Sequence, residues 1–116
     1  MAGVIFLKTK KFQEIKDFYL DLGAKIWLKQ PDINFFRHGN FIFAFHDQMD
    51  ADTCGCITFF YETKEEVNKM YEKYKSLAIT EPNVNEKYKI YNFFAKDPEN
   101  RLIEFQVFLN PIDYDW

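Results

Sequence analysis

The stretch DPENRLIEFQVF, residues 97–108, decides the fold of this chain, because it joins a tight turn to a strand that is typical of a protein core. Asp97 and Pro98 are turn formers, and Asn100 is the non-glycine residue that best tolerates a left-handed turn conformation. The strand that follows is apolar on one face, whereas Glu104 stands in the middle of the other. A carboxylate in the centre of such a strand requires a structural or a functional reason.

Composition and charge restrict the classes of function. The chain has 116 residues, which is enough for one domain with a single core, and 20% of them are aromatic. The net charge is −3 and there is no basic stripe, so nucleic acid and acidic membrane surfaces are poor candidate partners. The apolar run from Val4 to Leu7 is too short for a signal peptide or a membrane span. Cys54 and Cys56 indicate a reduced, cytoplasmic protein rather than a disulfide framework.

Hydrophobic periodicity predicts the same order of elements twice along the chain. In the first half we expect a strand, a helix and three strands, over residues 3–8, 11–23, 24–30, 33–39 and 40–46. In the second half we expect the same order over residues 56–62, 63–75, 77–82, 88–96 and 101–109. Thr63 and Glu66 have the spacing of a capping box at the start of the second helix.

The two halves align with each other, which predicts an internal repeat. An offset of 52 residues places Tyr19 on Tyr71, and an offset of 61 places residues 39–45 on residues 100–106. We therefore predict an α+β fold of two βαβββ modules that form a curved mixed sheet, with a concave inner face and the helices outside. We expect a single domain over residues 1–116, with repeat one at about 3–47, repeat two at about 54–108 and an irregular tail at 109–116.

Three segments resemble the vicinal oxygen chelate superfamily, which includes glyoxalase I, extradiol dioxygenases and bleomycin-resistance proteins. These segments are FYLDLGAKIW, TFFYETKEEV and DPENRLIEFQ, and the resemblance extends over roughly residues 3–108. The family usually has Asp-Pro-Asp-Gly-Asn where this chain has Asp97-Pro98-Glu99-Asn100-Arg101. The resemblance implies the glyoxalase-like fold and, for a chain of this length, a homodimer.

The resemblance also implies where a divalent metal would bind in metal-dependent members, on the first and last strands of each half. These positions fall on Val4, Phe43, Cys56 and Glu104, whereas such members use His and Glu. One carboxylate and one thiol do not supply the three nitrogen or oxygen donors that these metals need. We therefore expect no metal and no cofactor.

The histidines and cysteines have simpler structural interpretations. His38 lies in the turn RHGN, and His46 is expected on the face opposite Phe41, Phe43 and Phe45, which the repeat assigns to the cavity. Cys56 lacks a neighbouring His or Lys in the sequence that would activate it as a nucleophile.

Strand alternation places Glu104 on the concave face, while Ile103, Phe105 and Val107 face the helices. Burial would favour the protonated carboxyl unless a donor stabilises its charge. Glu104 is then a candidate anchor for an amine or hydroxyl, a candidate general base, or a carboxylate satisfied by tyrosines or water. The residues expected to line a ligand pocket around it are Val4, Phe6, Phe43, Cys56, Thr58, Phe60, Tyr91, Phe93 and Gln106.

Three classes of function remain open. The first is a metal-free protein that sequesters a hydrophobic or aromatic small molecule, as bleomycin-resistance members do. The second is an enzyme, lyase-like or dioxygenase-like, that uses Glu104 as a base or in an atypical metal site. The third is an interaction domain whose cavity is filled by Phe side chains. The tail segment 112–116 either contributes to the dimer interface or folds back over the core.

Overall fold

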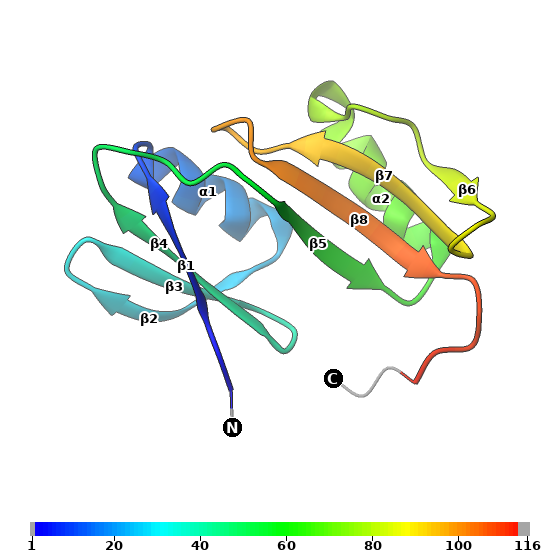
Figure 1. Ribbon diagram of the computed structural model, residues 1–116, viewed down its shortest axis with the longest axis horizontal. Coiled ribbons are helices and arrows are strands. Elements are labelled where there is room, and N and C mark those ends of the chain that lie inside the picture. Colours follow the sequence, from blue (N-terminus) through cyan, green and yellow to red (C-terminus); the bar gives the residue numbers. More distant parts are fainter. Residues whose placement is uncertain (1, 114–116) are drawn as a thin grey trace. The chain divides into compact units, whose positions relative to one another are not determined.

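The computed structural model describes residues 2–113 and divides into two units, unit 1 up to Thr53 and unit 2 from Cys54 onward (Figure 1). Each unit contains one α-helix and a four-stranded mixed sheet. The predicted order of elements, βαβββ in each half, is confirmed. Of the predicted interface segment, residues 114–116 lie outside the described residues. Within the described part of the chain, neither α-helix has the length and apolar content needed to cross a membrane.

In unit 1 the strands are arranged in the order β1-β4-β3-β2. Strand β1 pairs in parallel with β4, and the other neighbours are antiparallel. The elements are β1 (Ile5–Thr9), α1 (Phe12–Leu22), β2 (Lys25–Gln30), β3 (Ile33–His38) and β4 (Phe41–Asp47).

Unit 2 repeats this arrangement, with the order β5-β8-β7-β6 and a parallel pairing of β5 with β8. A short 3₁₀ helix, η1 (Lys75–Leu77), follows its α-helix. The other elements are β5 (Cys56–Tyr61), α2 (Lys64–Tyr74), β6 (Asn83–Asn85), β7 (Ile90–Lys96) and β8 (Leu102–Phe108). The predicted strand at 77–82 is wrong, since that segment forms η1, bends and a single bridge from Ala78 to Ala95.

The two α-helices begin in different ways. At α2, the hydroxyl of Thr63 accepts a hydrogen bond from the Glu66 amide at 3.1 Å, and the Glu66 carboxylate accepts one from the Thr63 amide at 3.1 Å. The predicted capping box is thus confirmed. At α1 the corresponding residue is Lys11, whose side chain forms no cap. Helix α1 ends at Leu22 and is followed by Gly23, whose φ of 124° is a conformation that only glycine adopts readily.

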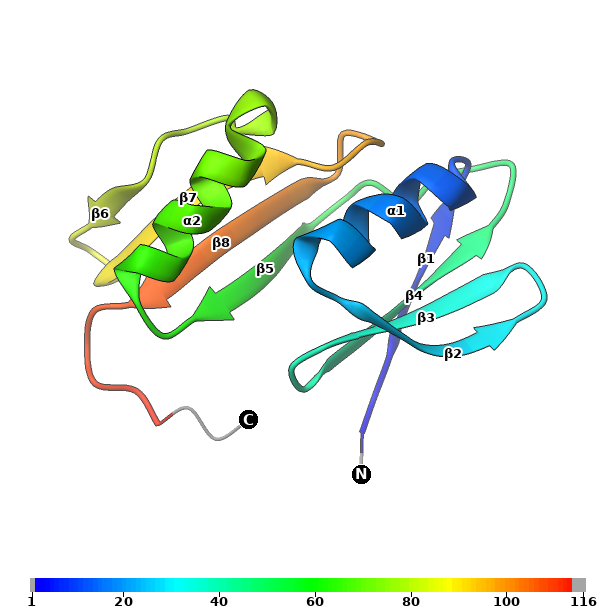
Figure 2. The ribbon, with the colours of Figure 1, turned by 180° about the vertical axis from the view of Figure 1, so that it is seen from behind.

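Each α-helix packs on one face of its own sheet (Figure 2). Aromatic side chains contribute to both contacts. In unit 1, Tyr19 of α1 contacts Phe43 and Phe45 with ring centroids 5.3 Å apart in both pairs. In unit 2, Tyr74 of α2 stacks on Phe105 at 6.0 Å. Burying each such ring stabilises the fold by about 1.5–3 kcal/mol. The opposite face of each sheet, called the far face below, carries the residues of interest.

Candidate functional site

Glu104 lies near the centre of β8, on the far face of the unit 2 sheet. Its strand neighbours in register are Thr58 of β5 and Phe94 of β7. Only 8% of Glu104 is exposed, whereas Ile103 and Phe105 on either side of it are fully buried on the helix-facing side. The predicted alternation along this strand is therefore confirmed.

Both carboxylate oxygens of Glu104 accept a hydrogen bond from a neighbouring strand. The hydroxyl of Thr58 donates to Oε1 at 2.7 Å, and the side-chain amide of Asn92 donates to Oε2 at 2.7 Å. Hydrogen bonds to a charged acceptor are shorter and stronger than neutral ones, and a donor on each oxygen offsets the cost of removing the carboxylate from water. We call Thr58, Glu104 and Asn92 the carboxylate cluster. These two hydrogen bonds explain structurally how a carboxylate can lie in the centre of β8.

A carboxylate still has free acceptor capacity after two hydrogen bonds, because its two oxygens offer about four lone-pair sites. Gln106 is the next far-face residue along β8, and it pairs with Asn92 in the sheet. Phe60 of β5 stacks on Phe108 of β8 with ring centroids 5.2 Å apart, and 41% of Phe60 is exposed. The far face of unit 2 thus combines a held carboxylate, an amide and an accessible aromatic pair.

Cys56 borders the carboxylate cluster at the start of β5. Its Sγ lies 3.8 Å from Oγ1 of Thr58. Partial burial raises the pKa of the Cys56 thiol, the hydrogen bond with Thr58 lowers it, and the nearby charge of Glu104 raises it further, for a net increase. The thiol therefore stays protonated at neutral pH, which makes it a weak nucleophile and a weak metal ligand.

The predicted residues of unit 1 divide between the two faces of its sheet. Phe6 is on the far face, where its ring contacts Phe35 at 5.4 Å, and Val4 precedes β1 and is exposed. Phe43 is fully buried against Tyr19 of α1, so its predicted placement on the concave face, with Phe45, is wrong.

A one-residue error in the repeat alignment caused this misplacement. The offset of 61 superimposes Gly39 on Asn100, which have φ angles of 59° and 63° and occupy equivalent turns. In the structure Phe6 pairs with Ala44, and its counterpart Thr58 pairs with Glu104. The last strands of the two units therefore align with an offset one residue shorter than 61. The counterpart of Glu104 in unit 1 is therefore Ala44, and the slip exchanged the two faces of β4.

A second slip affects β7. Tyr91 donates a hydrogen bond to Asn68 of α2 at 2.6 Å, and Phe93 contacts Tyr71 of α2 at 5.3 Å. Both residues are on the helix-facing side, and their predicted placement beside Glu104 is wrong. The residue between them, Asn92, is the cluster member that the sequence analysis missed. Its signal was available, since Asn92 is a polar residue inside an apolar strand, as Glu104 is.

The residues at the implied metal positions do not fit a divalent ion. Glu104 supplies a single carboxylate, the Cys56 thiol is protonated, and the side chains of Val4 and Ala44 have no atom that can bind a metal. Within residues 2–113, no three side chains of His, Cys, Asp or Glu form a group that could hold a metal ion. His46 lies on the far face of unit 1, where its register partner on β1 is Lys8, and it contacts Gln48 at 3.1 Å.

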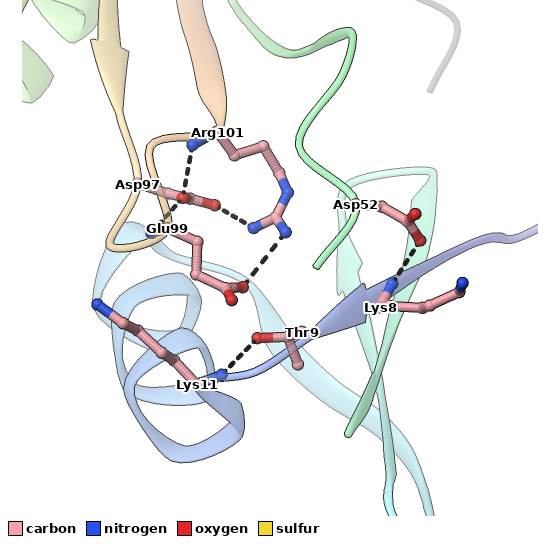
Figure 3. Close-up of polar contacts among 7 residues, drawn as sticks. All are labelled: Lys8, Thr9, Lys11, Asp52, Asp97, Glu99 and Arg101. Carbon is pink, nitrogen blue, oxygen red and sulfur yellow. Dashed lines mark hydrogen bonds and ion pairs between the residues drawn. The ribbon is translucent and has the colours of Figure 1, made fainter. Parts of the chain in front are cut away.

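The turn that leads into β8 is fixed by buried charges (Figure 3). The carboxylate of Asp97 accepts hydrogen bonds from the Arg101 guanidinium at 2.6 Å and from the Arg101 amide at 3.0 Å. The same guanidinium donates to Glu99 at 3.3 Å. The side chains of Arg101 and Asp97 are 1% and 0% exposed, so this pair is fully desolvated. It stabilises the turn from which β8 begins at Leu102.

Comparison with known proteins gives matches to solved structures only, since no protein-family model and no curated protein matches the chain. An integron cassette protein from the mobile metagenome of the Halifax Harbour sewage outfall has 18% identity and a TM-score of 0.78, covering 92% of this chain and 97% of that chain. Lactoylglutathione lyase from Agrobacterium tumefaciens has 18% identity and a TM-score of 0.74, covering 92% of each chain. A glyoxalase/bleomycin resistance protein/dioxygenase family enzyme from Burkholderia phytofirmans PsJN has 16% identity and a TM-score of 0.78, covering 90% of this chain and 95% of that chain.

These similarities define the fold. The chain has the glyoxalase-like fold, as predicted from the sequence. Because one such fold serves many functions, the activity has to be inferred from the far-face residues themselves.

Proposed function

We propose that this protein binds a small hydrophobic or aromatic molecule without a metal ion, with the carboxylate cluster of unit 2 as its polar anchor. The observation that carries the proposal is the double hydrogen bonding of Glu104 by Thr58 and Asn92. A charge held in place on a partly apolar face selects ligands with a matching donor, such as an amine or a hydroxyl group. The stacked pair of Phe60 and Phe108 offers an adjacent surface for an aromatic ring.

A homodimer is part of the same proposal, on the basis of the resemblance and the chain length. Native mass spectrometry of the untagged protein measures the subunit count and any retained ligand together. A dimer that retains an organic molecule supports sequestration and defines the chemical class of the ligand. A dimer that retains one divalent ion per chain contradicts the metal-free proposal.

Benzylamine and benzoate form a matched pair of probes for the anchor. Both carry a phenyl ring, but only benzylamine carries a cation that can pair with Glu104. We expect benzylamine to shift the backbone amide resonances of Thr58, Phe60 and Asn92 saturably, and benzoate to leave them unchanged. E104Q removes the charge of the anchor, and because hydrogen bonds to charged groups contribute about 1.5–3 kcal/mol, it should weaken benzylamine binding at least tenfold.

The control for this experiment is E72Q, which makes the same chemical change at an exposed residue of α2. It should bind benzylamine as the wild type does. Equal weakening in E104Q and E72Q would show a general charge effect and would contradict the role of Glu104 as anchor.

An enzyme that uses Glu104 as a general base is the second candidate. It is favoured by the unused acceptor capacity of the carboxylate and by the similarity in fold to a lactoylglutathione lyase. Incubation with lactoylglutathione, followed by mass spectrometry, separates the two candidates. Conversion that is lost in E104Q but kept in E72Q would replace the binding proposal with the enzymatic one.

A further inference from the structure

Unit 1 contains a small pocket where α1 ends and β3 turns into β4. The pocket has a volume of about 250 Å³ and is lined by Gly23, Lys25, Arg37 and Gly39. Two of its four lining residues have no side chain, and both have positive φ angles, 124° at Gly23 and 59° at Gly39. An ideal Cβ atom on Gly39 would meet nothing within 4 Å, so space is open above that backbone.

The two remaining lining residues are cations that face each other across a strand pair. Lys25 of β2 is the register partner of Arg37 of β3, so both side chains project from the same face of the sheet. Cβ atoms of such partners are about 4.5–5.5 Å apart, and like charges in this arrangement destabilise a sheet. Within residues 2–113 neither cation has an ion-pair partner. An anion bound between Lys25 and Arg37 would attract both cations and so offset their mutual repulsion.

Arg37 is already oriented for such a contact. Its Nε donates a hydrogen bond to the carbonyl oxygen of Gly39 at 2.9 Å, which fixes the plane of the guanidinium and leaves its terminal amino groups available. A fixed planar fork binds phosphate or carboxylate oxygens in pairs and loses less entropy than a mobile one. Burial lowers the pKa of the neighbouring His38, so its imidazole is neutral at neutral pH and the local charge comes from Lys25 and Arg37.

The C-terminus of α1 disfavours an anion in the pocket, but its electrostatic effect is smaller than that of the two cations. A helix C-terminus carries roughly half a negative charge, whereas Lys25 and Arg37 supply two full positive charges. Two of the last carbonyl oxygens of α1 also accept hydrogen bonds, from the amides of Gly23 and Ala24. The net field in the pocket therefore remains favourable for a dianion.

We propose that this pocket is a binding site for a small oxyanion of charge −2, of the phosphate monoester type, held by the guanidinium fork of Arg37 and the ammonium of Lys25. The volume favours a small group, because pockets for drug-sized ligands occupy about 300–1,000 Å³. The site is independent of the carboxylate cluster, which has the opposite charge and belongs to unit 2.

Titration of ¹⁵N-labelled protein with inorganic phosphate, at constant ionic strength, tests the site. We expect saturable shifts of the amide resonances of Gly23, Lys25 and Gly39. R37Q and K25Q should each weaken phosphate binding about tenfold, since each removes one charged contact. Both residues are exposed, and an otherwise unchanged amide spectrum shows that each variant is folded.

K29Q is the matched control, because Lys29 is exposed on the same strand but pairs with Asn34 rather than with a cation. It should bind phosphate as the wild type does. Shifts that grow linearly without saturation, or an equal loss in K29Q and K25Q, would show diffuse charge screening and overturn the proposal. A parallel titration with malonate identifies the source of the oxyanion, since stronger binding of phosphate assigns the pocket to phosphate groups and equal binding assigns it to dianions in general.

Discussion

The two units have the same strand order, yet the far faces of their sheets differ in chemistry at three equivalent positions. In unit 2 the equivalent positions hold Thr58, Glu104 and Asn92, which are joined by hydrogen bonds. In unit 1 the pairing places Phe6, Ala44 and Ile33 at these positions, which have no polar side-chain atoms.

The helix-facing sides do not differ in this way, because each is a layer of aromatic and aliphatic side chains packed on one helix. In unit 1 this layer includes Phe36, Phe43 and Phe45, and in unit 2 it includes Phe59, Phe93 and Phe105. The comparison indicates that the helix-facing layer maintains the fold. The far face carries polar side chains at the three equivalent positions in unit 2 and apolar ones in unit 1.

The largest expected effect distinguishes the buried arginine of unit 2 from the exposed arginine of unit 1. R101Q leaves the Asp97 carboxylate buried without its cation, which should cost about 3–5 kcal/mol in the free energy of unfolding. R37Q makes the same chemical change at an exposed residue and should cost less than about 0.5 kcal/mol. Urea unfolding followed by circular dichroism measures both. A loss below about 1 kcal/mol in R101Q would show that the pair contributes no more than a surface ion pair.

The carboxylate cluster should behave as one energetic unit. E104A leaves the donors of Thr58 and Asn92 without their acceptor, which should cost about 1–3 kcal/mol in unfolding free energy. Because T58V removes one of the same hydrogen bonds, the double variant should cost less than the sum of the two single variants, by about 0.5 kcal/mol or more. If the losses of unfolding free energy in E104A and T58V, measured by urea unfolding, add up strictly in the double variant, the two residues do not act as one energetic unit.

The two helix starts provide a third comparison. T63A removes the capping box of α2 and should cost about 1 kcal/mol in the free energy of unfolding. K11A removes no side-chain cap from α1 and should cost less. Thermal unfolding of the two variants, measured side by side, tests this order, and an equal or larger loss in K11A would contradict it.

The smallest expected effect is a pH dependence of the free energy of unfolding that arises in unit 1, where both histidines lie. Burial lowers the pKa of His38 in the folded protein, so the unfolded chain takes up a proton more readily. His38 therefore contributes stability above its unfolded pKa of about 6.5, and this contribution is lost as the pH falls below that value. H38Q should reduce the difference in urea midpoint between about pH 7.5 and pH 5.5. An unchanged difference would assign the acid sensitivity to carboxylates.

Local sequence signals predicted the parts of the fold that depend on neighbouring residues. The hydrophobic periodicity of residues 11–23, the capping box at Thr63 and the turn at Asp97 act over a few residues, and each is confirmed. Strand register depends on distant pairing and on loop length, and there the predictions failed by one residue at Phe43 and at Tyr91. A slip of one residue reverses the face of every side chain in a strand.

The sequence by itself determined the repeated βαβββ order and the position of Glu104 on a strand face away from the helix, because both follow from periodicity within single segments. Only the tertiary structure decided which donors hold that carboxylate, since Thr58 and Asn92 come from two other strands and reach Glu104 through sheet pairing. It alone also placed Lys25 opposite Arg37, two cations whose opposition no local pattern in the sequence reveals.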